Sequence, residues 1–309
     1  DNSANRLTTT FDYLFRQVFV EPLNWEIIIV DNASVDNTSI LANEILQKFP
    51  TLNFSYQIVT EPKQGLSFAR HTGVYKAKYE YIVFCDDDNW LAPDYLQHAY
   101  QLISQNPEIG VLGGQSYSVT DIPLPGWFKS FEAGYAIGKQ GEKSGYHTYN
   151  GVLWGAGMVT RKHLFLQSIN AEHPSLLTDR KGTEVTSGGD SEYCYRVLLQ
   201  NYKLYYNESL VLGHYLPSNR LTTEYRDQLF KSFEASSDCL YSYIEAIELK
   251  RNGKRRKLKL LAHAFKEVII RIFWNKRLSH KSVKVFYYFL NFRYKADKKL
   301  QVIKHFYDR

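Results

Sequence analysis

Long apolar segments are missing from this sequence, since no stretch approaches the ~18 uninterrupted apolar residues of a membrane-spanning helix. The printed N-terminus does not show the basic segment followed by an apolar one that is typical of a secretory signal. Cysteine is scarce: Cys85, Cys194 and Cys239 lie far apart and form no metal-type pair. Such a sparse, odd count argues against a disulfide framework and fits a reducing compartment. Internal repeats and low-complexity segments are also absent, which excludes a repeat architecture.

The length and charge of the chain indicate two parts. Its 309 residues exceed the ~100–200 residues of a typical domain, so we expect one large domain with an appendage. Aromatic residues make up 15% of the chain, with 24 Tyr and 18 Phe, which is ample for a sizeable core. Residues 250–309 carry 19 Lys and Arg against three acidic residues, whereas residues 1–249 carry 19 basic and 29 acidic residues. An acidic body with a basic tail predicts chemistry in the first part and attachment to an anionic surface through the second.

The most informative feature is a run of three carboxylates, Asp86, Asp87 and Asp88, directly after the apolar stretch 81–84. Consecutive carboxylates repel one another, so their place at the end of a buried strand needs a physical reason. Divalent cations such as Mg²⁺ and Mn²⁺ prefer carboxylate oxygens and neutralise such a cluster. Ligand sites in open α/β sheets also lie just beyond the carboxyl ends of the strands. A solvated acidic turn is the alternative for an isolated run of this kind.

Apolar runs alternate with segments of helical periodicity over the first 112 residues. The expected strands are 25–30, 54–59, 81–84 and 109–112, and the expected helices are 7–20, a capped helix ending at 49, 66–78 and 93–104. This alternation predicts a mostly parallel α/β sheet with helices on both faces. The later part is expected to contain an aromatic-rich loop at 117–150, a strand at 151–160, a helix at 190–200, a strand at 204–206 and helices from 223 to the end.

Five segments carry motifs in a consistent order: Ile29–Thr38, Gln64–Arg70, Phe84–Asp88, Trp154–Met158 and Gly189–Glu192. Together they resemble a family 2 glycosyltransferase of the GT-A fold, over roughly residues 2–222. The resemblance implies a Rossmann-like catalytic domain at 1–222 and a helical, basic extension at 223–309. Because that family normally opens with an apolar strand before the segment matched here, we expect the first strand to be missing from the printed chain.

The same resemblance assigns a metal site to the carboxylate run. Asp88 is expected to coordinate the metal, and Asp86 to contact the ribose or a metal-bound water, with Asp87 beside them at the donor. His214 matches a position that often completes the coordination shell. An imidazole ligand beside carboxylates favours Mn²⁺ over Mg²⁺. An ordinary hydrogen-bonded histidine is the alternative for His214.

Asp190 matches the catalytic aspartate of the family and is the expected general base. It opens a predicted helix, whose N-terminus favours the carboxylate form. An aspartate at that position also serves as a helix cap, and this is the alternative. Glu192 is expected to help orient the acceptor, unless it is a solvated acid of the first turn.

Four further residues are expected at the nucleotide-sugar donor. Asp31 ends a strand and matches a position that accepts hydrogen bonds from the nucleotide base. Arg70 is expected to contact the base or the phosphates, and Arg220 to close over the diphosphate through paired donors. Trp154, with its flanking glycines, would let the backbone approach the sugar. A surface arginine and ordinary core packing are the alternatives for Arg220 and Trp154.

The basic tail begins with a dense cationic segment at 250–259, followed by apolar residues at helical spacing. A basic amphipathic helix with aromatic residues at its edge can lie in a membrane interface. The alternative is a helical bundle packed on the catalytic domain. Nucleic-acid binding is disfavoured because no DNA- or RNA-binding motif accompanies the charge.

These features predict an inverting, metal-dependent glycosyltransferase that uses a nucleotide-diphosphate sugar, with UDP as the expected nucleotide. The expected acceptor is a glycan or a lipid-linked saccharide, at the cytoplasmic face of the plasma membrane. A nucleotidyltransferase is one alternative, although the Gly- and basic-rich phosphate loop of that class is not seen. A catalytically silent, membrane-bound assembly module is the other.

Overall fold

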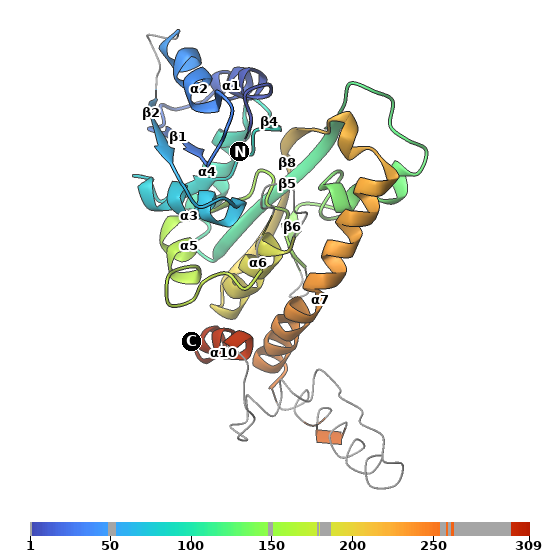
Figure 1. The fold of residues 1–309 in the computed structure, drawn as a ribbon. Coiled ribbons are helices and arrows are strands. Elements are labelled where there is room, and N and C mark those ends of the chain that lie inside the picture. Colours follow the sequence, from blue (N-terminus) through green and yellow to red (C-terminus); the bar gives the residue numbers. More distant parts are fainter. Residues whose placement is uncertain are drawn as a thin grey trace.

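The structure is a computed structural model that describes residues 2–48, 54–147, 151–177, 179, 187–253, 258, 261–262 and 298–309. Strands and helices alternate in the first part, and a long helix, α7, then leads toward the C-terminal helix α10 (Figure 1). The helices are α1 (Leu7–Phe15), α2 (Thr38–Gln47), α3 (Leu66–Lys76), α4 (Tyr95–Gln105), α5 (Lys162–Ser168), α6 (Gly189–Leu199), α7 (Thr223–Arg251) and α10 (Lys298–Asp308). The strands are β1 (Glu26–Asp31), β2 (Ser55–Thr60), β3 (Tyr81–Val83), β4 (Asn89–Leu91), β5 (Ile109–Val119), β6 (Gly145–Tyr146), β7 (Val159–Arg161) and β8 (Lys203–Tyr215). Short 3₁₀ helices are η1 (Phe128–Ser130), η2 (Glu132–Tyr135) and η3 (Ser218–Arg220).

The described strands form two sheets. β1 and β2 pair in parallel, and the larger sheet has the order β3-β7-β5-β8-β4 with β6 added to β8. The expected α/β class is confirmed, but the larger sheet is mixed, since only β5 and β8 run parallel among its described pairs. The expected strand at 151–160 is mostly a loop, and only its end forms β7. This loop delivers the chain to the carboxyl end of β3, where Phe84 N donates to Met158 O at 2.8 Å, so β7 runs back against β3.

β8 is much longer than the predicted strand at 204–206, because the polar residues 207–209 form a bulge instead of a turn. The register against β5 shifts around Gly114, and a Cβ atom there would lie 1.9 Å from the carbonyl oxygen of Leu210. Glycine at this position therefore lets the two strands pass the bulge in contact. As a result β8 continues to His214, which lies opposite Asn89 of β4.

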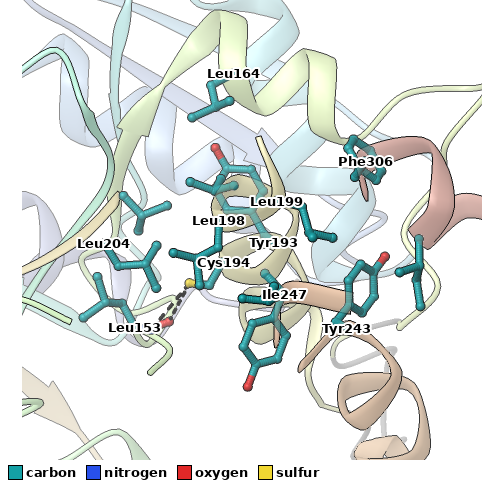
Figure 2. Packing of buried hydrophobic residues seen from close by; sticks show 14 of the residues in the cluster. Leu153, Leu164, Tyr193, Cys194, Leu198, Leu199, Leu204, Tyr243, Ile247 and Phe306 are labelled. Carbon is teal, nitrogen blue, oxygen red and sulfur yellow. Dashed lines mark hydrogen bonds between the residues drawn. The ribbon is translucent and has the colours of Figure 1, made fainter. Parts of the chain in front are cut away.

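The largest core cluster lies between the larger sheet and helices α6, α7 and α10 (Figure 2). The boundary predicted after residue 222 coincides with the start of α7, where the Thr222 side chain accepts a hydrogen bond from Tyr225 N. The side chains of α7 and α10 nonetheless pack into the same cluster as α6. The buried residues labelled in the figure are Leu153, Leu164, Tyr193, Cys194, Leu198, Leu199, Leu204, Tyr243, Ile247 and Phe306.

Most of the predicted membrane-binding segment lies outside the described residues, which omit 254–257, 259–260 and 263–297. Within the part of the chain that is described, no helix combines the length and the apolar character needed to cross a bilayer. Helix α10 buries one face, formed by Leu300, Ile303 and Phe306, against the core.

Gly114→Ala is expected to lower the free energy of unfolding by about 3 kcal/mol or more, because the new methyl group meets a backbone oxygen held in the strand pair. Gly126→Ala is the matched control, since a Cβ atom there would meet nothing within 4 Å. Its free energy of unfolding should change by less than about 1 kcal/mol. Urea unfolding measures both values, and equal losses in the two variants would contradict the role of the bulge.

Candidate functional site

The run 86–88 follows β3, and each of its three carboxylates meets a different cation. Asp86 Oδ2 lies 3.7 Å from Arg70 Nη2 of α3. Asp87 Oδ2 accepts hydrogen bonds from Arg6 Nε at 2.9 Å and Nη2 at 2.5 Å. Arg6 was not singled out in the sequence, because only the fold brings it to this run. Desolvation raises the pKa of Asp86, the Arg70 charge opposes this, and the two neighbouring carboxylates reinforce it.

The third carboxylate, Asp88, is buried between the side chains of Arg220 and His214. Arg220 Nη1 of η3 donates to its Oδ2 at 2.8 Å, and Asn89 Nδ2 donates to its Oδ1 at 3.0 Å. His214 Nε2 lies 3.6 Å from Oδ1, which is too long for a hydrogen bond. The register of β4 on β8 sets this approach, since Asn89 pairs with His214.

Asp88 and His214 have the chemistry of a metal-binding pair. Their oxygen and nitrogen donors converge, and His214 Nδ1 is buried with no hydrogen-bond partner within the described part of the chain. A group of three or more His, Cys, Asp or Glu side chains positioned to hold a metal ion is not found among the described residues. The two residues therefore fit a cation that draws its other ligands from a substrate.

Arg70 lies between two groups of carboxylates. On one side is Asp86, and on the other Arg70 Nη1 lies 3.7 Å from Asp179 Oδ2. Its guanidinium also packs over the ring of Phe84, at 5.2 Å from the ring centroid. A Cβ atom at position 155 would lie 2.6 Å from Arg70 Nη2, so a larger residue there would displace the guanidinium. Gly155 thus leaves room for the Arg70 guanidinium.

Asp190 lies in the first turn of α6. Its Oδ2 accepts a hydrogen bond from Gly155 N at 3.0 Å, and its Oδ1 accepts one from Ser191 N at 2.7 Å. The charge of Asp190 also acts on Arg70. The structure therefore brings the expected base, Asp190, to the same arginine as Asp86.

Asp179 is a site residue that the sequence did not reveal. Its Oδ1 accepts a hydrogen bond from Gly189 N at 2.8 Å, beside Asp190. Desolvation, followed by repulsion from Asp190, raises the pKa of Asp179 to about 6, although Arg70 opposes the shift. No motif marks this residue. The only signal is an acidic residue shortly before the two glycines that open α6.

Glu192 lies away from the site, in the core on the other face of α6. Its carboxylate binds Arg196 Nη2 at 2.6 Å and the Tyr243 hydroxyl at 2.8 Å, and it also accepts from Leu176 N and Leu177 N. The side chains of this pair are 0% and 1% exposed. We therefore do not retain the expectation that Glu192 orients an acceptor, because its carboxylate holds α6, α7 and the loop before α6 together.

Asp31 lies at the end of β1, in the smaller sheet. Its carboxylate accepts hydrogen bonds from Ser34 N at 3.2 Å and from the Ser39 hydroxyl. Desolvation opposes ionisation, but these hydrogen bonds outweigh it and lower the pKa of Asp31. The segment 2–6 connects this loop with the carboxylate run, since it contacts the loop and its Arg6 pairs with the second carboxylate.

Trp154 is half-buried in the loop before β7, next to Gly155. Its backbone N donates to Gln140 Oε1 at 2.6 Å, which ties this loop to the aromatic-rich segment 117–147. The position of Trp154 beside the Gly155–Asp190 contact is consistent with a place at the sugar or acceptor.

Comparison with known proteins identifies a family. The family model described as Glycosyl transferase family 2 matches residues 2–165, more than half of the chain. Glycosyltransferase GlyA of Streptococcus pneumoniae is 28% identical over 121 residues, which cover 39% of this chain and 16% of GlyA. Poly-beta-1,6-N-acetyl-D-glucosamine synthase of Staphylococcus epidermidis is 27% identical over 135 residues, covering 43% of this chain and 32% of the synthase. The matched region thus spans about a third or less of either relative.

Two solved structures share the fold. TarS of S. aureus in complex with UDP has a TM-score of 0.50 and 16% identity, covering 84% of this chain and 72% of the TarS chain. The mannosyltransferase PcManGT of Pyrobaculum calidifontis, in complex with GDP-Man and Mn²⁺, has a TM-score of 0.53 and 14% identity, covering 98% and 70%. At these identities the likeness establishes the fold alone, and this is the expected GT-A fold.

Glu192→Gln is expected to lower the free energy of unfolding by about 3–5 kcal/mol, because it leaves the buried charge of Arg196 without its anionic partner. Glu132→Gln is the matched control, since Lys129, its partner, is 85% exposed. The control should cost less than about 1 kcal/mol. Denaturant unfolding compares the two, and a Glu192→Gln variant as stable as the control would contradict the structural role of the pair.

Proposed function

This chain belongs to glycosyl transferase family 2, and on that premise we propose that it moves a sugar from a nucleotide-diphosphate donor to a saccharide acceptor. The proposal rests on one observation: Arg70 pairs with Asp86 of the carboxylate run, and the charge of Asp190 acts on the same guanidinium. We assign Asp86 and Asp88 to a donor side and Asp190 to an acceptor side. A glycosyl transfer needs these two sides on either face of one reacting carbon.

On the donor side, Asp88 and His214 would hold Mn²⁺ or Mg²⁺, and the imidazole favours Mn²⁺. When bound, the cation would act as a Lewis acid on the diphosphate oxygens. Arg220, now 2.8 Å from Asp88, would share its charge with the departing diphosphate. Asp86 and Asp31 remain our candidates for the ribose and the base.

On the acceptor side, Asp190 would take the proton from the attacking hydroxyl group. The hydroxyl oxygen bonds to the anomeric carbon while the bond from that carbon to the diphosphate oxygen breaks. A single displacement of this kind inverts the anomeric configuration. The hydrogen bond from Gly155 N fixes one oxygen of Asp190 and thereby its orientation toward the acceptor.

UDP is our proposed nucleotide, supported by the UDP complex of TarS, and the GDP-Man complex of PcManGT makes GDP the comparator. The synthase of Staphylococcus epidermidis, which is named for a polysaccharide, supports a growing glycan or a lipid-linked saccharide as the acceptor. Attachment to an anionic, cytoplasmic membrane surface through the basic tail remains a proposal based on the charge of residues 250–259.

Calorimetric titration of UDP in Mn²⁺ tests this function without knowledge of the acceptor. Binding is expected in Mn²⁺ and should be lost in excess EDTA. Asp88→Asn should lower the affinity by about 100-fold or more, because it removes a metal-binding charge. Asp94→Asn is the control, since Asp94 is half-exposed and pairs only with His98 among its described ionic contacts, so its affinity should stay within about twofold.

Preference for GDP would keep the enzyme class and change the donor. A folded sample that binds neither nucleotide would overturn the proposal and favour a non-catalytic assembly role. Binding of a nucleoside triphosphate in preference to both diphosphates would instead favour a nucleotidyltransferase.

A further inference from the structure

Asp179 supplies a capping group that the start of α6 lacks. The residue before the helix is Gly188, which has no side chain to accept a hydrogen bond from the first turn. Asp179 reaches this turn from the loop before α6, and its Oδ1 accepts from Gly189 N at 2.8 Å. Its side chain is only 12% exposed. A buried carboxylate thus lies at the helix N-terminus that carries Asp190.

The sequence of the helix start makes room for this carboxylate. A Cβ atom at Gly189 would lie 2.4 Å from Asp179 Oδ2, so any larger residue would displace it. The residue directly before the candidate base is therefore a glycine, and a carboxylate from the preceding loop fills the space.

Asp179 also faces the reacting groups. Its other oxygen lies 3.7 Å from Arg70 Nη1, and the same guanidinium pairs with Asp86 through Nη2. Among the described residues, charged groups that act on Asp179 include Asp190 of α6, Arg70 of α3 and Asp86 after β3. A simple helix cap would need no contact with the arginine of the site.

We propose that Asp179 is a positioning residue for Asp190, which holds the first turn of α6 and draws the Arg70 guanidinium toward the candidate base. The inference rests on the proposed function, since it gives Asp190 the role of base. Ionised Asp179 pairs with Arg70 and places a second negative charge beside Asp190. Protonated Asp179 loses this ion pair and with it the hold on the Arg70 guanidinium.

The first test is the pH dependence of thermal unfolding, which needs no substrate. Because the pKa of Asp179 is raised from 3.8 to about 6 in the folded protein, its contribution to stability is lost as pH rises through this range. Asp179→Asn has no such loss. The melting temperature of the variant minus that of the parent should therefore rise between pH 4 and pH 6 and then level off.

The same comparison of melting temperatures in an Asp190→Asn background completes a double-mutant cycle. Without the Asp190 charge, the pH-dependent gain from Asp179→Asn should shrink, because the repulsion that raises the pKa of Asp179 is gone. A melting-temperature difference that is constant with pH and equal in both backgrounds would overturn the proposal and leave Asp179 as a helix cap. If Asp179→Asn does not fold, Gly189→Ala serves instead, since it displaces the same carboxylate and should weaken the parent's pH dependence.

The second test is kinetic, with UDP-N-acetylglucosamine as the probe donor and UDP release as the signal. Asp179→Asn should lower kcat at pH 7.5 by about 10–100-fold and leave the KM for donor within about twofold. In the parent, kcat should change near pH 6 as Asp179 titrates, and this change should be absent from the variant. Unchanged kcat and pH profile would overturn the role. UDP titration separates this outcome from failure of the proposed function: Asp179→Asn should bind Mn²⁺ and UDP like the parent. If the parent neither binds UDP nor releases it, the thermal cycle alone decides the coupling of Asp179 to Asp190.

Discussion

The structure depends on the compensation of three consecutive negative charges at the end of one short strand. Each carboxylate of 86–88 meets a cation from a different part of the chain, namely Arg70, Arg6 and Arg220. An unpaired charge at a buried site is strongly destabilising, so helices α1 and α3 and the segment after β8 are all held near this run. The pairing also explains why three carboxylates can be adjacent. Asp88 has both Arg220 and His214 beside it. Of the three carboxylates it is therefore the one best placed to exchange its contact with Arg220 for a metal ion.

The fold was predictable where the signal is local. The alternation of apolar runs and helical periodicity gave β1 to β3 and α1 to α4 with errors of a few residues at their ends. The length of β8 was not predictable, because residues 207–209 have the composition of a turn and only the partner strand turns them into a bulge. That partner needs Gly114, almost a hundred residues earlier. The error matters for function, since the extended strand carries His214 to Asp88.

The site was predictable where a motif names the residue, and not where the fold creates the contact. Asp190 was expected from its segment and stays a prediction as the base, whereas Arg6 and Asp179 have no motif and reach this region only through tertiary structure. Glu192 is a different case, because its carboxylate is buried with Arg196. Positions two apart on a helix differ by about 200° in direction, so Asp190 and Glu192 point to different sides of α6. The helical period, applied to α6, would have assigned Glu192 to the core.

The burial of Glu192 has a consequence for the C-terminal helices. Arg196, its partner, donates to the carbonyl oxygens of Ser168, His173 and Pro174 and so fixes the loop that leads toward Asp179. The same network includes a hydroxyl of α7, and the ring of a phenylalanine of α10 lies against the guanidinium. Residues after 222 therefore support the loop and the helix that carry the acceptor side. A protein cut at that boundary would keep the donor-side carboxylates but would lose the packing that orients the candidate base.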